Sequence, residues 1–272
     1  MRVSLFVTCL IDAMYPQVGV STVKLLRRLG VEVDFPKDQV CCGQPAMNSG
    51  YHDAAREAAA ALIKAFAGSE YVVGPSGSCV SMIRHYYPVL FKGHPLEKEA
   101  KAFAAKTFEL SQFIVEVLGK DDLNAHFPGR ATYHTSCHMT RGLGVVDPPL
   151  RLLRNVRGLE LVDLPHREDC CGFGGTFAVK MADLSTAMAD EKIDHASEVG
   201  AEYLVGSDMA CLMHLGGRAE RRGESIKVIH LAELLEQGTR PERLEESGGP
   251  ARGAAAPGDS AASTRAKGAG RL

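Results

Sequence analysis

The sequence predicts an α/β protein made of two tandem, duplicated domains, each with a mainly parallel sheet flanked by helices. One observation is a cysteine pattern that occurs twice and uses all eight cysteines: Cys9, Cys41, Cys42 and Cys79, then Cys137, Cys170, Cys171 and Cys211. Matching cysteines are 128 to 132 residues apart. The other observation is that both halves alternate short apolar runs with amphipathic segments in the same order, which indicates an internal repeat.

The first half begins with strand signals and continues into helices. Apolar runs typical of strands cover 3–9, 31–35 and 71–73. The helical segments between them end at Gly30 and, for the alanine-rich helix over 53–67, at Gly68, because glycine commonly ends helices. A helical repeat covers 101–118, and 119–130 is expected to link the halves. The first domain is therefore predicted to span residues 1–120.

The second half repeats this order. Strands are predicted over 131–137, 159–162, 203–205 and 226–229. Helices are predicted from Asp147 to near Gly158, over 179–198 and over 231–236. The second domain is expected to span 121–237. Residues 238–272 contain Gly, Ala, Ser, Pro and Arg without aromatics, so a disordered polar tail is predicted there.

Charge and hydropathy argue against several classes of protein. The net charge is -2 and no basic cluster with aromatics is present, so nucleic acid is not an expected partner. The chain has no apolar run near the ~18 residues that a membrane span needs, and residues 3–7 read as a strand rather than a signal peptide. A cytoplasmic protein without a transmembrane segment is expected. Its thiols would stay reduced and be available to metal or redox chemistry.

Thiolates bind both iron-sulfur clusters and structural zinc, so residue type alone does not decide between them. The sequence lacks the C-x2-4-C pairs of ordinary zinc sites, and adjacent cysteines are expected to diverge toward different atoms of a larger cluster. Glycines beside the Cys-Cys pairs favour close approach of backbone N–H groups. These features favour a multi-iron cluster over zinc. No G-x-G-x-x-G fingerprint follows a strand, so no dinucleotide site is predicted.

The repeated C-x31-CCG-x35-C pattern resembles the CCG, or cysteine-rich, domain family of iron-sulfur electron-transfer proteins, which includes a component of heterodisulfide reductase and the glycolate oxidase iron-sulfur subunit. The segments that resemble the lactate-utilisation branch of this family are SLFVTCLIDAMYPQVG, VDFPKDQVCCGQPAMNSGY, GPSGSC, HTSCHMTRGLG, CCGFGGTFAVKMA and CLMHLGGR. The resemblance runs from Met1 to about Glu236.

The resemblance implies an iron-sulfur subunit of a complex that oxidises L-lactate to pyruvate and needs its partners, lactate utilisation proteins B and C, for turnover. It implies two [4Fe-4S] clusters, cubane or noncubane, held by the eight cysteines. Each motif in the wider family ends in C-x-x-C, and Met82 and His214 stand at the final positions here, which makes His214 a candidate extra iron ligand. The alternatives are a heterodisulfide-reductase-like thiol/disulfide oxidoreductase subunit and a zinc or thiol binding module.

Three residues near Cys137 are candidates for substrate contact or proton donation, namely His134, His138 and Arg141. Each also has an ordinary interpretation as a hydrogen-bonding loop residue. His166 is a candidate donor to a cluster sulfur, and Lys180 is a candidate cation that offsets the cluster's negative charge. A solvated loop and a solvated helix start are the alternatives for these two.

Overall fold

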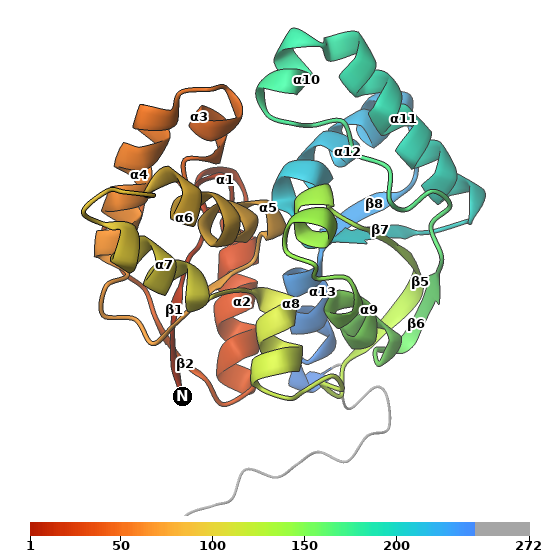
Figure 1. Ribbon diagram of the computed structural model, residues 1–272. Coiled ribbons are helices and arrows are strands. Elements are labelled where there is room, and N and C mark those ends of the chain that lie inside the picture. Colours follow the sequence, from red (N-terminus) through yellow and green to blue (C-terminus); the bar gives the residue numbers. More distant parts are fainter. Residues whose placement is uncertain (243–272) are drawn as a thin grey trace, which may run out of the picture.

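The computed structural model describes residues 1–242 and contains two four-stranded parallel sheets, one in each half of the chain (Figure 1). The strand order is β2-β1-β3-β4 in the first sheet and β6-β5-β7-β8 in the second. The strands are β1 (Arg2–Leu5), β2 (Glu32–Asp34), β3 (Tyr71–Gly74), β4 (Thr107–Glu109), β5 (His126–His134), β6 (Arg157–Val162), β7 (Tyr203–Gly206) and β8 (Lys227–His230). Equal strand order in both halves confirms the predicted tandem α/β duplication.

Helices connect successive parallel strands in both halves, as parallel pairing requires. In the first half they are α1 (Cys9–Met14), α2 (Pro16–Arg28), α3 (Gln44–Asn48), α4 (His52–Ala65), α5 (Gly77–Ser81), the π-helical turn η1 (Met82–Tyr86), α6 (Tyr87–Leu90), α7 (Glu97–Ala105), α8 (Leu110–Gln112) and the π-helical turn η2 (Phe113–Val117). In the second half they are the π-helical turn η3 (His138–Gly142), α9 (Asp147–Arg154), α10 (Thr176–Lys180), α11 (Ala182–Glu198), α12 (Met209–Arg222) and α13 (Leu231–Gly238). Within residues 1–242, none of them combines the length and apolar character that a bilayer crossing needs.

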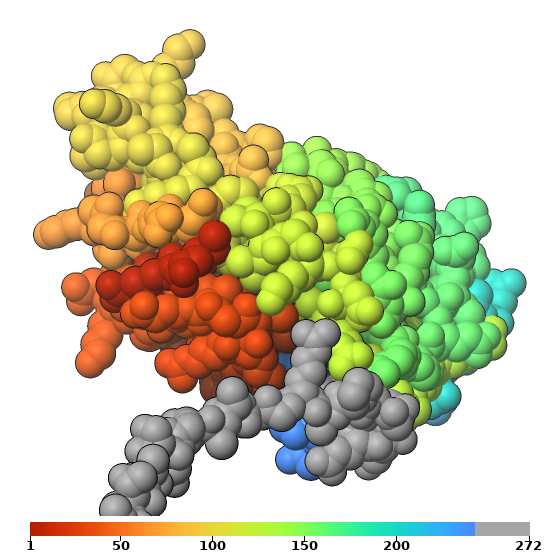
Figure 2. All heavy atoms as spheres, turned by 90° about the horizontal axis from the view of Figure 1, so that it is seen from below, coloured from red at the N-terminus to blue at the C-terminus, as the bar shows by residue number. Residues whose placement is uncertain are grey.

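A shared hydrophobic core joins the two halves. Helices α2, α8, α9 and α13 lie side by side between the sheets (Figure 1), and α2 packs on α13 while α8 packs on α9. Arg28 of α2 also pairs with the buried carboxylate of Glu236 in α13 at 2.8 Å. On the face seen in Figure 2, atoms of the first half, red to yellow, lie directly against the green atoms of the second. Separate apolar clusters fill the outer faces of the two sheets.

The duplication extends to individual positions. The order of buried and exposed residues is identical in 51–70 and 181–200, so Leu62 of α4 corresponds to Lys192 of α11. Strand register gives a second correspondence, because Val3 pairs with Tyr71 as Ala131 pairs with Tyr203. Counting three residues onward from Val3 and Ala131 makes Phe6 and His134 equivalent. These matches allow the two halves to be compared side chain by side chain.

The expectation of one helix over 101–118 is wrong. Residues 107–109 form β4, which pairs in parallel with β3, and α7 ends before it at Ala105. The apolar spacing looked continuous because α7 and the turn after β4 both bury residues, among them Phe103 and Ile114. Glu109 ends the strand and caps α8 by accepting hydrogen bonds from the backbone N–H groups of Ser111 and Gln112.

Element boundaries elsewhere differ by a few residues. Strand β5 begins at His126, so part of the segment 119–130 belongs to the second sheet rather than to a linker. The helix from Asp147 ends at Arg154, since the backbone after it joins β6 beside β5. Thr239, placed in the predicted tail, is buried and accepts a hydrogen bond from Arg28. Most of that predicted disordered tail, 243–272, lies outside the described residues.

The buried carboxyl group of Glu109 should make the free energy of unfolding depend on pH. Burial raises the pKa of Glu109 to about 7 from its ordinary 4.5. Between these pH values the folded chain holds a proton that the unfolded chain releases, so the free energy of unfolding should fall as pH rises. We expect Glu109→Gln to remove about 3 kcal/mol of this fall, from ~1.4 kcal/mol per pKa unit. Urea unfolding of both proteins between pH 4.5 and 7.5 measures it, and parallel pH profiles would contradict the assignment.

Candidate metal centre

The cysteines of each half lie in three separate segments, which follow three strands at the same edge of the sheet. Cys9 and Cys137 follow β1 and β5, the Cys-Cys pairs lie in the loops after β2 and β6, and Cys79 and Cys211 lie in the first turns of α5 and α12. The carboxyl ends of parallel strands meet at one edge, which is the usual ligand crevice of an α/β sheet. All eight thiols are free, so the structure holds them together without a disulfide.

In the first half the four thiols form a continuous series of contacts. The Sγ atoms of Cys9 and Cys41 are 3.5 Å apart. Cys42, which is buried, contacts both Cys41 and Cys79 through its thiol. Four sulfur donors from distant parts of the sequence therefore follow one another along the sheet edge.

The second half repeats this arrangement around a cavity. The Sγ atoms of Cys171 and Cys211 are 3.0 Å apart, and Cys170 contacts both Cys137 and Cys171. All four thiols line a cavity of about 120 Å³, together with residues of the first half that include Gln44 and Ser78. This volume exceeds the ~30 Å³ share of one water molecule in the liquid, so the space suits a group of several atoms better than a single ion.

The thiols in each set cannot all ionise without a cation. Hydrogen bonds with Cys42 and then Cys9 lower the pKa of Cys41, and those with Cys137 and then Cys171 lower the pKa of Cys170. The pKa values of the neighbouring Cys9 and Cys137 are raised, first by their hydrogen bonds to these same sulfurs and then by burial. A metal ion or cluster would supply the positive charge needed for four thiolates. The donor set therefore fits a thiolate-bound metal centre.

The thiols of adjacent cysteines interact, Cys41 with Cys42 and Cys170 with Cys171. The divergence of each pair toward different atoms of a larger cluster stays a prediction. The thiol-lined cavity of the second half therefore carries the distinction from zinc.

Glycine is required after each Cys-Cys pair. Gly43 and Gly172 both have φ of 83°, in the left-handed region that favours glycine. A Cβ atom would lie 3.0 Å from the Ala55 carbonyl oxygen at Gly43 and 2.5 Å from that of Ser185 at Gly172. The same turns aim backbone N–H groups at sulfur, from Gly43 to Cys41 at 3.5 Å and from Gly172 to Cys170 at 3.4 Å.

The two thiol sets lie on either side of the contact between the halves. Asp208, the N-cap of α12, accepts a hydrogen bond from the backbone N–H of Ser78 in α5 at 2.7 Å. Gly77 donates to the Ser207 carbonyl at 3.3 Å, and a Cβ on Gly77 would lie 2.6 Å from Met139. The helices that carry Cys79 and Cys211 thus begin against each other.

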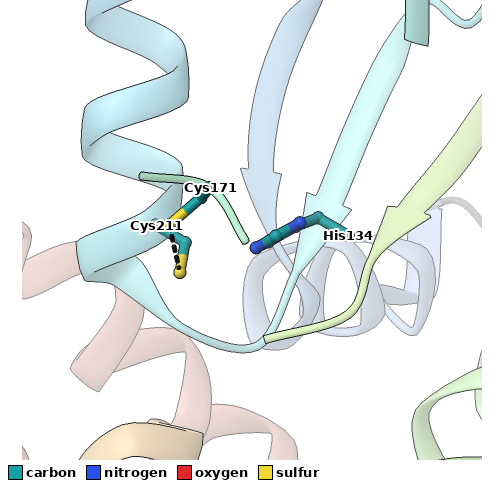
Figure 3. A group of neighbouring side chains, drawn as sticks. All are labelled: His134, Cys171 and Cys211. Atoms are coloured by element: carbon teal, nitrogen blue, oxygen red, sulfur yellow. Dashed lines mark hydrogen bonds between the residues drawn. The ribbon is translucent and has the colours of Figure 1, made fainter. Parts of the chain in front are cut away.

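Of the three candidate substrate residues, His134 is buried, His138 is half-buried and Arg141 is exposed. His134 is 1 % exposed at the end of β5, and both of its ring nitrogens lack a hydrogen-bond partner among the described residues. A ring nitrogen and the Sγ atoms of Cys171 and Cys211 lie within 4.8 Å of one another, with the imidazole directed toward the thiols (Figure 3). Burial, and then the charge of Lys192, lower the pKa of His134 to about 3, so its ring is neutral.

His138 and Arg141 line an open cavity of about 560 Å³ beside Cys137. The Nδ1 atom of His138 is 3.7 Å from the Cys137 Sγ atom. Arg141 donates a hydrogen bond to the Glu168 carbonyl at 2.6 Å, which orients its guanidinium group. The structure therefore places these two residues together, in an open cavity that adjoins the thiol-lined one, since Cys137 and His138 line both.

The remaining sequence candidates lie in other surroundings. The Nε2 atom of His214 is 3.2 Å from the Ser185 hydroxyl, so Ser185 engages that ring nitrogen. Met82 is fully buried in the first half's outer core, as a packing residue. Lys180 is exposed at the end of α10, and the ring of His166 stacks on that of His195.

Sequence analysis missed Lys192, the buried cation nearest the second set. Its Nζ donates to the His166 carbonyl at 2.7 Å. Burial lowers the pKa of Lys192, while the charges of Asp169, Cys171 and Cys170 act in the opposite direction. The signal was available in the sequence, because Lys192 interrupts the apolar face of α11 that Ala189, Ile193 and Ala196 form. A lysine there resembles an ordinary helix-surface residue unless the face is already known to be buried.

Comparison with known proteins identifies the family of this chain. A cysteine-rich domain model, CCG, matches residues 3–84 and again 131–216. Lactate utilization protein A of Geobacillus thermodenitrificans is 60 % identical over 236 residues, which cover 86 % of this chain and 98 % of that protein. Lactate utilization protein A 2 of Bacillus cereus (strain 03BB102) is 52 % identical over 239 residues, covering 88 % and 99 %.

Solved structures offer only a distant likeness. Glutamate racemase RacE1 of Bacillus anthracis has a TM-score of 0.32 and 9 % identity, with 91 % of this chain and 82 % of that chain covered. This likeness is too low to bear on fold or function. The two domain matches and the relatives instead confirm the resemblance found in the sequence. The chain belongs to the lactate utilization protein A family and carries the cysteine-rich CCG domain twice.

Proposed function

We propose that this protein is an iron-sulfur electron-transfer subunit of a complex that oxidises L-lactate to pyruvate in lactate utilization. The observation that carries the proposal is the convergence of four free thiols at the same sheet edge in each half. The printed names of the relatives, which say lactate utilization, supply the substrate class. Bound [4Fe-4S] clusters would supply one-electron transfer, with cubane and noncubane forms both compatible with the donor set.

Two features favour iron-sulfur clusters over zinc. The cavity lined by Cys137, Cys170, Cys171 and Cys211 has room for a group larger than one ion. The second half also offers an uncommitted buried imidazole beyond its four thiols, whereas a structural zinc site is complete with four ligands. The eight cysteines would hold two clusters, four thiolates to each.

The chain's own residues would hold and tune these centres. The N–H groups of Gly43 and Gly172 donate to thiolates, which stabilises the more negative, reduced state. The contact between Asp208 and Ser78 fixes the two cysteine helices relative to each other, so electrons could pass between halves without a domain motion. Thiol ligands of this kind suit the reducing cytoplasm, where we place the protein.

Lactate, or its product pyruvate, would bind through its carboxylate group beside Cys137. Arg141 presents a guanidinium group to the open cavity, where it would bind a carboxylate, and His138 would donate or accept a proton there. No dinucleotide fingerprint is present in the sequence, so a partner protein would take part in the two-electron oxidation. Lactate utilisation proteins B and C are the partners we propose.

A thiol/disulfide reaction of the heterodisulfide reductase type is the second candidate. The observation that favours it is the same open cavity, because a disulfide could reach the neighbourhood of Cys137 through it. Reduction of disulfides by the isolated, cluster-loaded protein without lactate would support this second candidate.

Ligand variants test the thiol sets one at a time. We expect Cys42→Ser and Cys171→Ser each to lose about half of the bound iron and sulfide, because each removes one of four thiolates from a single centre. Anaerobic reconstitution followed by iron and sulfide assay measures the loss. Met82→Leu, a change in the first half's outer core, is the control and should keep the full content. Full retention in both serine variants would contradict the ligand assignment.

Arg141 is tested by lactate turnover. In a complex reconstituted with the partner proteins, we expect Arg141→Gln to lower kcat/KM for lactate roughly 30-fold or more, from the ~2 kcal/mol of a charge-assisted hydrogen bond. Iron content should stay unchanged. Lys180→Gln removes an exposed cation outside this cavity and serves as control. Equal kcat/KM in Arg141→Gln and wild type would exclude Arg141 from substrate binding.

A further inference from the structure

The two halves carry different residue types where their first strands end. Phe6 directly follows β1, and the equivalent residue in the second half is His134, the last residue of β5. Both side chains are buried, with Phe6 at 0 % and His134 at 1 % exposure. An apolar ring in one half is therefore replaced by a ring with two polar nitrogens in the other, at equal burial.

The buried ring nitrogens of His134 are unpaired among the described residues. Neither ring nitrogen has a hydrogen-bond partner among the described residues, and leaving a buried polar atom unpaired costs ~1–3 kcal/mol. His230 shows the ordinary solution at the same exposure. Its Nε2 lies 3.1 Å from the Pro75 carbonyl, and its Nδ1 accepts a hydrogen bond from the Ala232 N–H. The cost at His134 is explained if a bound group takes up a nitrogen.

The unpaired ring lies beside the thiols of the second half. Figure 3 shows the His134 imidazole extending from the end of β5 toward Cys171 and Cys211. One ring nitrogen and the two Sγ atoms lie within 4.8 Å of one another, and all three side chains are buried. A neutral imidazole has the free lone pair that iron coordination needs.

A second polar replacement accompanies the first. Lys192 occupies the place that Leu62 holds in the first half, and both are buried. The charge of Lys192 is attracted to Cys170 and Cys171 and repelled by a protonated His134. The second centre thus has an imidazole and a cation where the first has Phe6 and Leu62, so the sequence repeat encloses two chemically different centres.

We propose that His134 is a fifth protein ligand to the second centre, binding iron through a ring nitrogen, while the first centre has four thiolates alone. This inference rests on the proposed iron-sulfur function. It gives the imidazole role to His134 instead of His214, whose Nε2 contacts Ser185. An additional nitrogen ligand and a nearby lysine both change the surroundings of the iron, so the two centres have different reduction potentials.

The test is pulsed electron paramagnetic resonance on anaerobically purified, reduced protein with ¹⁵N-labelled histidine. A Cys42→Ser background, in which the first centre is depleted, isolates the second centre's signal. We expect the hyperfine coupling of a directly bound nitrogen, and its loss in His134→Phe, the residue type that the first half uses. His214→Gln should retain the coupling.

The outcomes separate this inference from the proposed function. An iron-sulfur signal without bound-nitrogen coupling overturns the His134 assignment and leaves the cluster proposal standing. Coupling that survives in His134→Phe or disappears in His214→Gln also overturns it. Protein without iron and inorganic sulfide overturns both. If His134→Phe fails to fold, absence of the coupling from the labelled protein with its native His134 still overturns the assignment.

A redox titration gives a second readout. We expect the midpoint potential of the second centre to shift in His134→Phe, while the first centre's potential, measured in a Cys171→Ser background with and without the same change, stays fixed. An unchanged second-centre potential would contradict coordination by His134.

Discussion

The structure depends on four thiols from three separated segments meeting at one edge of a parallel sheet. Because β1, β2 and β3 are parallel, the loops that follow them begin at the same edge of the sheet. The same holds for β5, β6 and β7 in the second half. Hydrogen bonds to the neighbouring sulfur, and then burial, raise the pKa values of Cys9 and Cys137, so the four thiols of a set would need a cation to ionise together. The left-handed turns at Gly43 and Gly172 complete each set by bringing backbone N–H groups to sulfur.

The halves repeat each other, but they share one interior. The central helices form a common core, and α5 and α12 begin against each other through Asp208 and Ser78. Two thiol sets held in this way have a fixed separation, which suits the electron transfer that we propose between them. The repeat is nevertheless unequal where it matters for redox chemistry, because His134 and Lys192 replace Phe6 and Leu62 around the second centre.

Much of this could be read from the sequence. The cysteine spacing and the alternation of apolar runs predicted the duplicated α/β fold and the family, and they named the eight thiols that converge. Strand β4 was missed because residues 107–109 continue the apolar spacing of the helices around them, and only pairing with β3 separates them. Cys-Cys geometry, the burial of Lys192 and the unpaired nitrogens of His134 depend on which faces pack together. Local sequence patterns do not encode this packing, although Lys192 does interrupt the apolar face of α11.

The central claim is that these thiols enclose iron and inorganic sulfide, and counting both in anaerobically purified protein tests it most directly. Two [4Fe-4S] centres predict iron and acid-labile sulfide in equal amounts, about eight of each per chain, in a brown protein. A colourless protein that contains zinc and no labile sulfide would contradict the account.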